Sequence, residues 1–161
     1  MARYARLLGA SWLQLAEPVR SVHATPPTMH ARGRLRIEHG RSHLARFLAR
    51  LLRLPRASEA AETPTRQYQA AAGELAERFG VLEFRFRLEV SEGSLLFRQL
   101  EAAFLLGSVR LPLPATWAPR VDAREDPAGA RQIKVHVRVA LPALGPVLTY
   151  DGTIDIEDTH A

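Results

Sequence analysis

The stretch Val81-Leu-Glu-Phe-Arg-Phe-Arg-Leu-Glu-Val90 alternates apolar and charged side chains along its whole length. A period of two is the pattern of a β-strand with one buried side and one solvated side. Ser91-Glu92-Gly93 follows as a hairpin turn, and another apolar stretch runs from Ser94 to Leu106. The pattern therefore predicts a pair of antiparallel strands, and this prediction decides the fold class.

Four more stretches extend the prediction to a sheet. Residues 29–39, 121–125, 133–141 and 147–157 alternate in the same way and are separated by turns rich in Gly and Pro. Strands with one wet side and hairpin-length turns favour an antiparallel sheet over a parallel one. We therefore expect a mainly β (α+β) fold, with an antiparallel sheet that is curled or barrel-like.

Helical spacing is confined to the first part of the chain. Residues 4–23 have it, and Pro18 suits the first turn of a second short helix. Residues 42–54 form the clearest amphipathic helix, which Pro55 ends, and we expect its apolar stripe to pack against the sheet rather than on a membrane. Residues 68–79 favour helix by their alanines and glutamates, although Gly73 weakens that interpretation.

Length and composition indicate one domain spanning residues 1–161. It would consist of an N-terminal helical segment, residues 1–24, and a β-rich core, residues 29–157, that includes the helix at 42–54. The chain has no cysteine, which excludes disulfides and thiolate metal sites. No apolar run is long enough to span a membrane and the N-terminus makes a poor signal peptide, so we expect a cytoplasmic protein.

The net charge of +5 does not by itself indicate a nucleic-acid binder. Of the 22 basic residues only Lys134 is a lysine, so the chain is arginine-rich, and the arginines are spread along it. Nucleic-acid binders concentrate their basic residues on one face. We expect neither nucleic acid nor a membrane as a partner.

Several blocks, taken in their order, resemble a known family. They are Glu17-Pro-Val-Arg-Ser-Val-His23, the strand Gly33–Gly40, the helix end at Pro55, Gly73-Glu-Leu-Ala-Glu-Arg-Phe-Gly80, Leu111–Pro114 with Ala118-Pro119, and Leu148-Thr-Tyr-Asp-Gly152. Together they resemble the bacterial family catalogued as domain of unknown function 4166, over most of the chain.

The resemblance implies that the block at residues 73–80 is a β-strand, against its helical propensity. It also implies an auxiliary or ligand-holding role, because members of the family occur fused to NAD-dependent oxidoreductase-like or epimerase-like domains. One feature departs from the family. Its Trp-x-Arg-x-Phe-like block before the Gly73 motif is missing, since residues 56–67 are too few to hold it. The chain therefore looks like a shortened member.

Six residues are candidates for a ligand-binding site. Arg20 and His23 lie three apart at a helix end, where they could face a cavity or simply cap the helix. Glu77 and Arg78 could serve a pocket or form a cross-strand ion pair. Arg98 interrupts an apolar face, unless a bulge turns it to solvent. Tyr150 lies on the apolar side of the last strand. Nothing indicates a metal or a cofactor, and no catalytic residue can be assigned.

These signals leave three hypotheses open. The first is a module that binds a small apolar ligand or an amphipathic anion and is auxiliary to an oxidoreductase. The second is a cofactor-independent cyclase or isomerase that uses His23, Glu77 and Tyr150 as acid–base groups within one pocket. The third is a structural domain that docks on an oxidoreductase through an exposed apolar patch.

Overall fold

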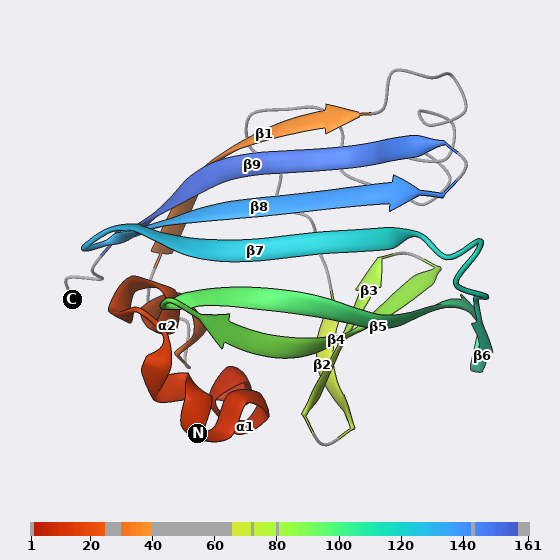
Figure 1. The fold of residues 1–161 in the computed structure, drawn as a ribbon, viewed down its shortest axis with the longest axis horizontal. Helices are drawn as coiled ribbons and strands as arrows, with labels where there is room; N and C mark the ends of the chain where they lie inside the picture. Colours follow the sequence, from red (N-terminus) through yellow and green to blue (C-terminus); the bar gives the residue numbers. More distant parts are fainter. Residues whose placement is uncertain are drawn as a thin grey trace.

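The computed structural model describes residues 2–24, 30–39, 66–71, 73–79, 81–142 and 144–157. They form a nine-stranded antiparallel sheet in the order β1-β9-β8-β7-β5-β4-β3-β2, with β6 paired to β5 (Figure 1). The sheet is open, since β1 and β2 lie at the two ends of this order. The expectation of a mainly β, curled antiparallel fold is confirmed, and the barrel-like alternative is not.

In the described part of the chain before β1 there are three short helical elements: α1 (Arg3–Leu8), the 3-10 helix η1 (Gly9–Gln14) and α2 (Glu17–His23). Pro18 lies in the first turn of α2, as predicted, because a proline there loses no helical hydrogen bond. Residues 40–65 lie outside the described part of the chain, and with them the predicted helix at 42–54.

Each predicted strand stretch forms a strand. The bounds are β1 (His30–His39), β2 (Arg66–Ala71), β3 (Glu74–Phe79), β4 (Leu82–Ser91), β5 (Ser94–Leu106), β6 (Val109–Pro112), β7 (Arg120–Gly129), β8 (Gln132–Leu141) and β9 (Gly145–Glu157). The helical interpretation of residues 68–79 is wrong. They form parts of the hairpin β2–β3, because pairing of β3 with β4 supplies hydrogen bonds that outweigh a weak local preference.

The predicted hairpin of β4 and β5 is present, but its loop has two residues, Glu92 and Gly93, because Ser91 belongs to β4. Glu92 and Gly93 both have positive φ angles, 52° and 80°, which is the geometry of a type I′ turn. The loop also holds the helical segment, because the backbone N–H of Ala16 donates to the carbonyl oxygen of Gly93 at 2.9 Å.

The apolar face predicted for the first half of β5 is wrong. Leu95 and Phe97 are buried there, whereas Arg98 is exposed and its Nε donates to Glu89 at 2.9 Å. A register shift in the pairing with β4 reverses the alternation further along, so Ala102 is buried as expected. A bulge inserts one residue and moves every later side chain to the other face.

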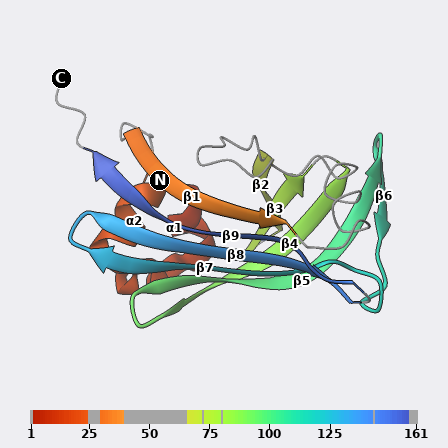
Figure 2. The same ribbon diagram turned by 90° about the horizontal axis from the view of Figure 1, so that it is seen from above.

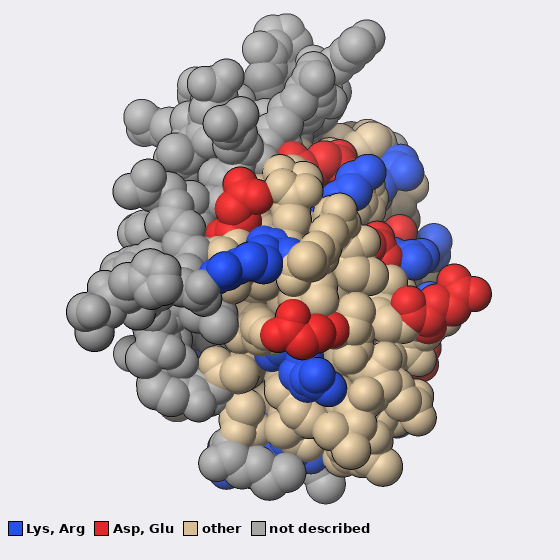
Figure 3. All heavy atoms as spheres, turned by 90° about the vertical axis from the view of Figure 1, so that its left-hand side faces the viewer, with Lys and Arg blue, Asp and Glu red and all other residues tan. Residues whose placement is uncertain are grey.

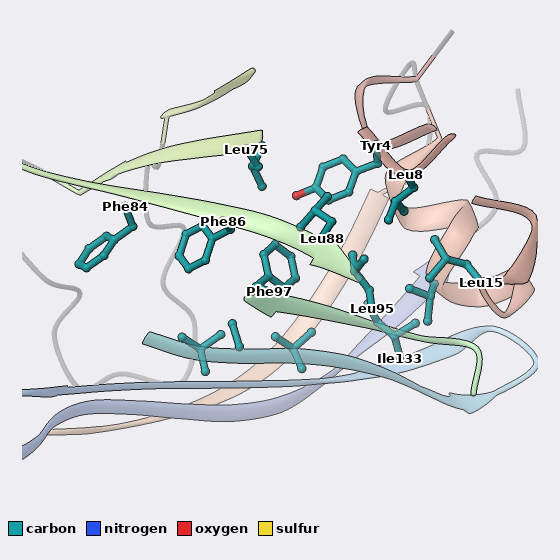
Figure 4. Packing of buried hydrophobic residues seen from close by; sticks show 14 of the residues in the cluster. Tyr4, Leu8, Leu15, Leu75, Phe84, Phe86, Leu88, Leu95, Phe97 and Ile133 are labelled. Atoms are coloured by element: carbon teal, nitrogen blue, oxygen red, sulfur yellow. The ribbon is translucent and has the colours of Figure 1, made fainter. Parts of the chain in front are cut away.

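The core lies on the concave face of the curled sheet. Phe84, Phe86 and Phe97 project into it from β4 and β5 (Figure 4), and the rings of Phe86 and Phe97 meet edge to face with centroids 5.9 Å apart. The helices cover one end of the sheet (Figure 2). Their side chains Tyr4 and Val19 are buried. The curl follows from the right-handed twist of strands, and it creates an interior between strands that do not pair.

Candidate functional site

An apolar pocket of about 90 Å³ lies on the concave face. Side chains from β3, β4, β5, β7, β8 and β9 line it, and most of them are aliphatic or aromatic. The described residues that line it are Glu77, Leu82, Phe84, Phe97, Val121, Ala123, Arg124, Glu125, Val135, Val137, Val139, Leu148 and Tyr150. An apolar lining with a few polar groups is the usual composition of a small-molecule site.

Two of the six candidate residues meet in this pocket. Glu77 comes from β3 and Tyr150 from β9, two strands that do not pair in the sheet. Only the curl of the sheet brings them together across the concave face. Burial, then the negative charges of Glu77 and Glu125, raise the pKa of the Tyr150 phenol well above its ordinary value of 10.0. The phenol therefore stays protonated near neutral pH and can donate a hydrogen bond.

A third candidate reaches the pocket indirectly. The ring nitrogen Nε2 of His23 lies 2.5 Å from Oε2 of Glu125, and both side chains are largely buried. The ring of Tyr4 stacks on the His23 ring with centroids 4.0 Å apart. His23 thus joins α2 to the pocket wall through Glu125.

The remaining candidates lie elsewhere. Arg20 is half-buried on α2, Arg78 alternates with Glu77 on β3, and Arg98 is exposed on β5. None of these three lines the apolar pocket, but Arg98 lines a second hollow beside it.

Sequence reasoning missed Glu125, although a signal was present. Val121, Ala123 and Glu125 are alternate residues of one strand, so their side chains point to the same, apolar face of the sheet. The alternation therefore predicts a carboxylate on an apolar face. A charge on a buried, apolar face destabilises the fold unless it has a partner, and here the partner of Glu125 is His23.

A second hollow of about 430 Å³ adjoins the pocket and shares Phe97 and Val121 with it. It lies where β5 and β7 stop pairing beyond Arg98 and Asp122. The side-chain amide of Gln99 connects the two strands at this split, the place where β5 and β7 no longer pair. Its Nε2 donates to the carbonyl oxygen of Pro119 at 2.8 Å, and its Oε1 accepts from the backbone N–H of Val121 at 2.6 Å.

The most buried charged side chain of the described residues is structural. Glu83 is 2% exposed and lies on the outer face of β4. It accepts hydrogen bonds from Arg110 at 2.7 Å, from Arg85 at 3.4 Å and from the Tyr68 hydroxyl. This network, which also includes Glu101, connects β2, β4, β5 and β6.

Four large apolar side chains remain exposed on the hairpin β5–β6. Phe104 pairs with Leu111 and Leu106 with Val109, so the four share one face. This is the kind of patch that the docking hypothesis requires, but nothing shows a partner, and the hypothesis stays a prediction.

Acidic and basic side chains are interspersed on the face seen in Figure 3. Among the described residues there is no group of three metal-ligating side chains. No described helix is long and apolar enough to cross a membrane.

The fold and the pocket define a class of protein: an open, curled antiparallel sheet with a small apolar pocket on its concave face. Residues 56–154 match the family described as Domain of unknown function (DUF4166), so the chain belongs to that family. This confirms the resemblance. No curated protein and no solved structure matches the chain.

Proposed function

We propose that this domain binds a small, mainly apolar molecule in the pocket of the concave face. The observation that carries the proposal is the lining itself, in which apolar side chains from six strands surround Glu77, Glu125 and Tyr150. A few polar groups in an apolar wall give a ligand both burial and orientation.

The volume limits what the pocket accepts. About 90 Å³ is less than the ~150 Å³ of an engineered cavity that binds benzene. It is also less than the roughly 300–1,000 Å³ typical of whole-ligand sites. The pocket therefore suits an aliphatic group of a few carbons, and the rest of a larger ligand would extend into the adjoining hollow of about 430 Å³.

Titration with n-butanol, followed by amide chemical shifts, tests the proposal. Ala123 lines the pocket and is 9% exposed, so Ala123→Leu should fill the pocket and abolish binding. Ala128 is exposed on the same strand, and Ala128→Leu is the matched control that should bind as the parent does. Shifts that do not centre on the pocket, or that persist in Ala123→Leu, would refute the proposal.

A second candidate is a cofactor-independent isomerase, favoured by the convergence of Glu77 and Tyr150. The Glu77 carboxylate would take a proton from the carbon next to a carbonyl group, and the Tyr150 hydroxyl would donate to the carbonyl oxygen. Glu77 would then return the proton to the substrate. The enzyme should exchange deuterium from D₂O into butanone faster than Glu77→Gln does. Equal rates for the two proteins would exclude this reaction.

A further inference from the structure

The exposed apolar side chains of the hairpin β5–β6 lie on the same face of the sheet as the pocket. Phe104 pairs directly with Leu82, which lines the pocket, and opposed residues of an antiparallel pair point to one face. Phe104 also pairs with Leu111, and Leu106 pairs with Val109 one step further from the pocket. These four hairpin residues, which we call the apolar strip, continue the pocket wall toward the end of β5 that lies away from the helices (Figure 1).

The hollow between β5 and β7 connects the pocket to the apolar strip. It shares Phe97 and Val121 with the pocket. Ala102 also lines the hollow, and alternation along β5 places it on the same face as Phe104. Leu113 lies beside Ala102, because its backbone N–H donates to the carbonyl oxygen of Ala102 at 2.8 Å. Pocket, hollow and strip therefore form one path along the concave face.

The charged side chains beside this path point to the outer face of the sheet. Those that line the hollow among the described residues are Arg98, Glu101, Arg120 and Asp122. Three of them directly precede or follow Phe97 or Val121, so alternation turns them away from the pocket side. Glu101 accepts from Arg110 in the network of the outer face. A ligand segment that lies along the path therefore contacts mainly apolar groups.

The dimensions of the path favour a thin, extended occupant. The pocket of about 90 Å³ holds only a few carbons. From Ala102, which pairs with Phe84 of the pocket wall, to Leu106 the path covers roughly 13 Å, at ~3.3 Å per strand residue. An α-helix, ~10 Å across, is too wide to enter the pocket. The strip residues are 38% to 61% exposed, so they offer apolar area that a chain leaving the pocket would cover.

We infer that the ligand carries an unbranched hydrocarbon chain of roughly ten carbons, one end of which occupies the pocket while the rest lies through the hollow and on the apolar strip. The inference rests on the proposed function and names the class of ligand. A short or branched aliphatic molecule would fill the pocket and leave the strip uncovered.

The test compares n-butanol with n-decanol, which have the same polar group and differ in chain length. A fully buried methylene strengthens binding about fourfold, and one that is covered on a single side about twofold. Over the additional methylenes n-decanol should therefore bind roughly fifty-fold tighter than n-butanol. Amide shifts should extend to Phe104 and Val109 with n-decanol and stay at the pocket with n-butanol.

Leu106→Ser shortens the apolar strip at its far end. The variant should bind n-decanol several-fold more weakly and n-butanol as the parent does, so retained n-butanol binding shows that it is folded. Leu13→Ser is the matched control, because Leu13 is 75% exposed on η1, away from the path. It should leave both affinities unchanged, whereas alcohols that simply associate with exposed leucines would respond to both variants.

The outcomes separate the two proposals. Equal affinities for the two alcohols, n-decanol shifts confined to the pocket, or an equal loss of n-decanol binding in the two serine variants overturns the inference and leaves the pocket proposal intact. Sedimentation equilibrium adds a further outcome: a dimer that Leu106→Ser dissociates would show that a second copy covers the strip, which also overturns the inference. Absence of pocket shifts with both alcohols refutes the proposed function and the inference together.

Discussion

Glu83→Gln removes one charge from the buried network while keeping the shape of the side chain. In the parent, the carboxylate accepts two charge-assisted hydrogen bonds, from Arg110 at 2.7 Å and from Arg85 at 3.4 Å, and a third bond from Tyr68. The glutamine keeps the geometry but can accept only through one oxygen, and it carries no charge.

The magnitude follows from the number and exposure of these bonds. Charge-assisted bonds contribute about 1 kcal/mol more than neutral ones. Arg110 and Arg85 are 23% and 27% exposed, and both also contact Glu101, so neither is left fully unpaired. We therefore expect Glu83→Gln to lower the free energy of unfolding by about 2 kcal/mol, less than the ~3–5 kcal/mol for breaking a fully buried pair.

The loss should depend on pH. Burial raises the pKa of Glu83, but the hydrogen bonds from Tyr68 and Arg110 and the positive charges of Arg110 and Arg85 outweigh it, so the folded pKa lies below the ordinary value of 4.5. A lowered folded pKa gives stability that is present above the unfolded pKa and lost as the pH falls through the folded one. The parent and Glu83→Gln should therefore differ fully at neutral pH and converge well below 4.5.

Urea unfolding followed by far-ultraviolet circular dichroism, at neutral and at acid pH, measures both effects. Glu89→Gln is the matched control. It removes an ion pair with Arg98 in which the side chains are 45% and 62% exposed, and should cost about 0.5 kcal/mol or less. If the two glutamine variants lose the same stability, or if the Glu83→Gln loss does not shrink in acid, the assignment of a stabilising buried carboxylate is wrong.

Two further substitutions test the anchoring of the helical segment and the split in the sheet. Gly93→Ala should lower the free energy of unfolding more than Gly107→Ala does. Both glycines have a positive φ, which costs an alanine ~1–2 kcal/mol. Only at Gly93 would the added Cβ also lie close to Ala16, at 3.1 Å from its Cβ. Equal urea midpoints for the two variants would contradict this. Gln99→Leu should lower the free energy of unfolding by ~1–3 kcal/mol, because the carbonyl of Pro119 and the N–H of Val121 both lose their partner. It should also speed hydrogen exchange at the Val121 amide. Unchanged exchange there would show that the Gln99 bridge does not hold the split.

The strands and their main turn could be predicted because their causes are local. Alternation with a period of two needs only one buried side, and the Glu92-Gly93 loop needs only two residues with positive φ. Pro18 similarly marks the start of α2 without reference to the rest of the chain. These features follow from side-chain chemistry over a few neighbouring residues.

Other features depended on which strand lies beside which. Residues 74–79 form β3 because β4 pairs with them, and Arg98 faces solvent because a register shift in β4–β5 reverses the alternation between the two halves of β5. Neither partner nor register shift is visible in the local sequence, since both are set by long-range pairing.

The site itself was decided by the tertiary structure. Sequence reasoning selected Glu77, Tyr150 and His23 one by one, but it also selected three arginines that do not line the pocket, and it missed Glu125. The curl of the sheet brings β3 to face β9 across the concave side and places Glu125 between them and His23. The sequence by itself therefore determined the antiparallel strands, whereas only the curved sheet determined which polar side chains share an apolar pocket, because that depends on contacts between strands that do not pair.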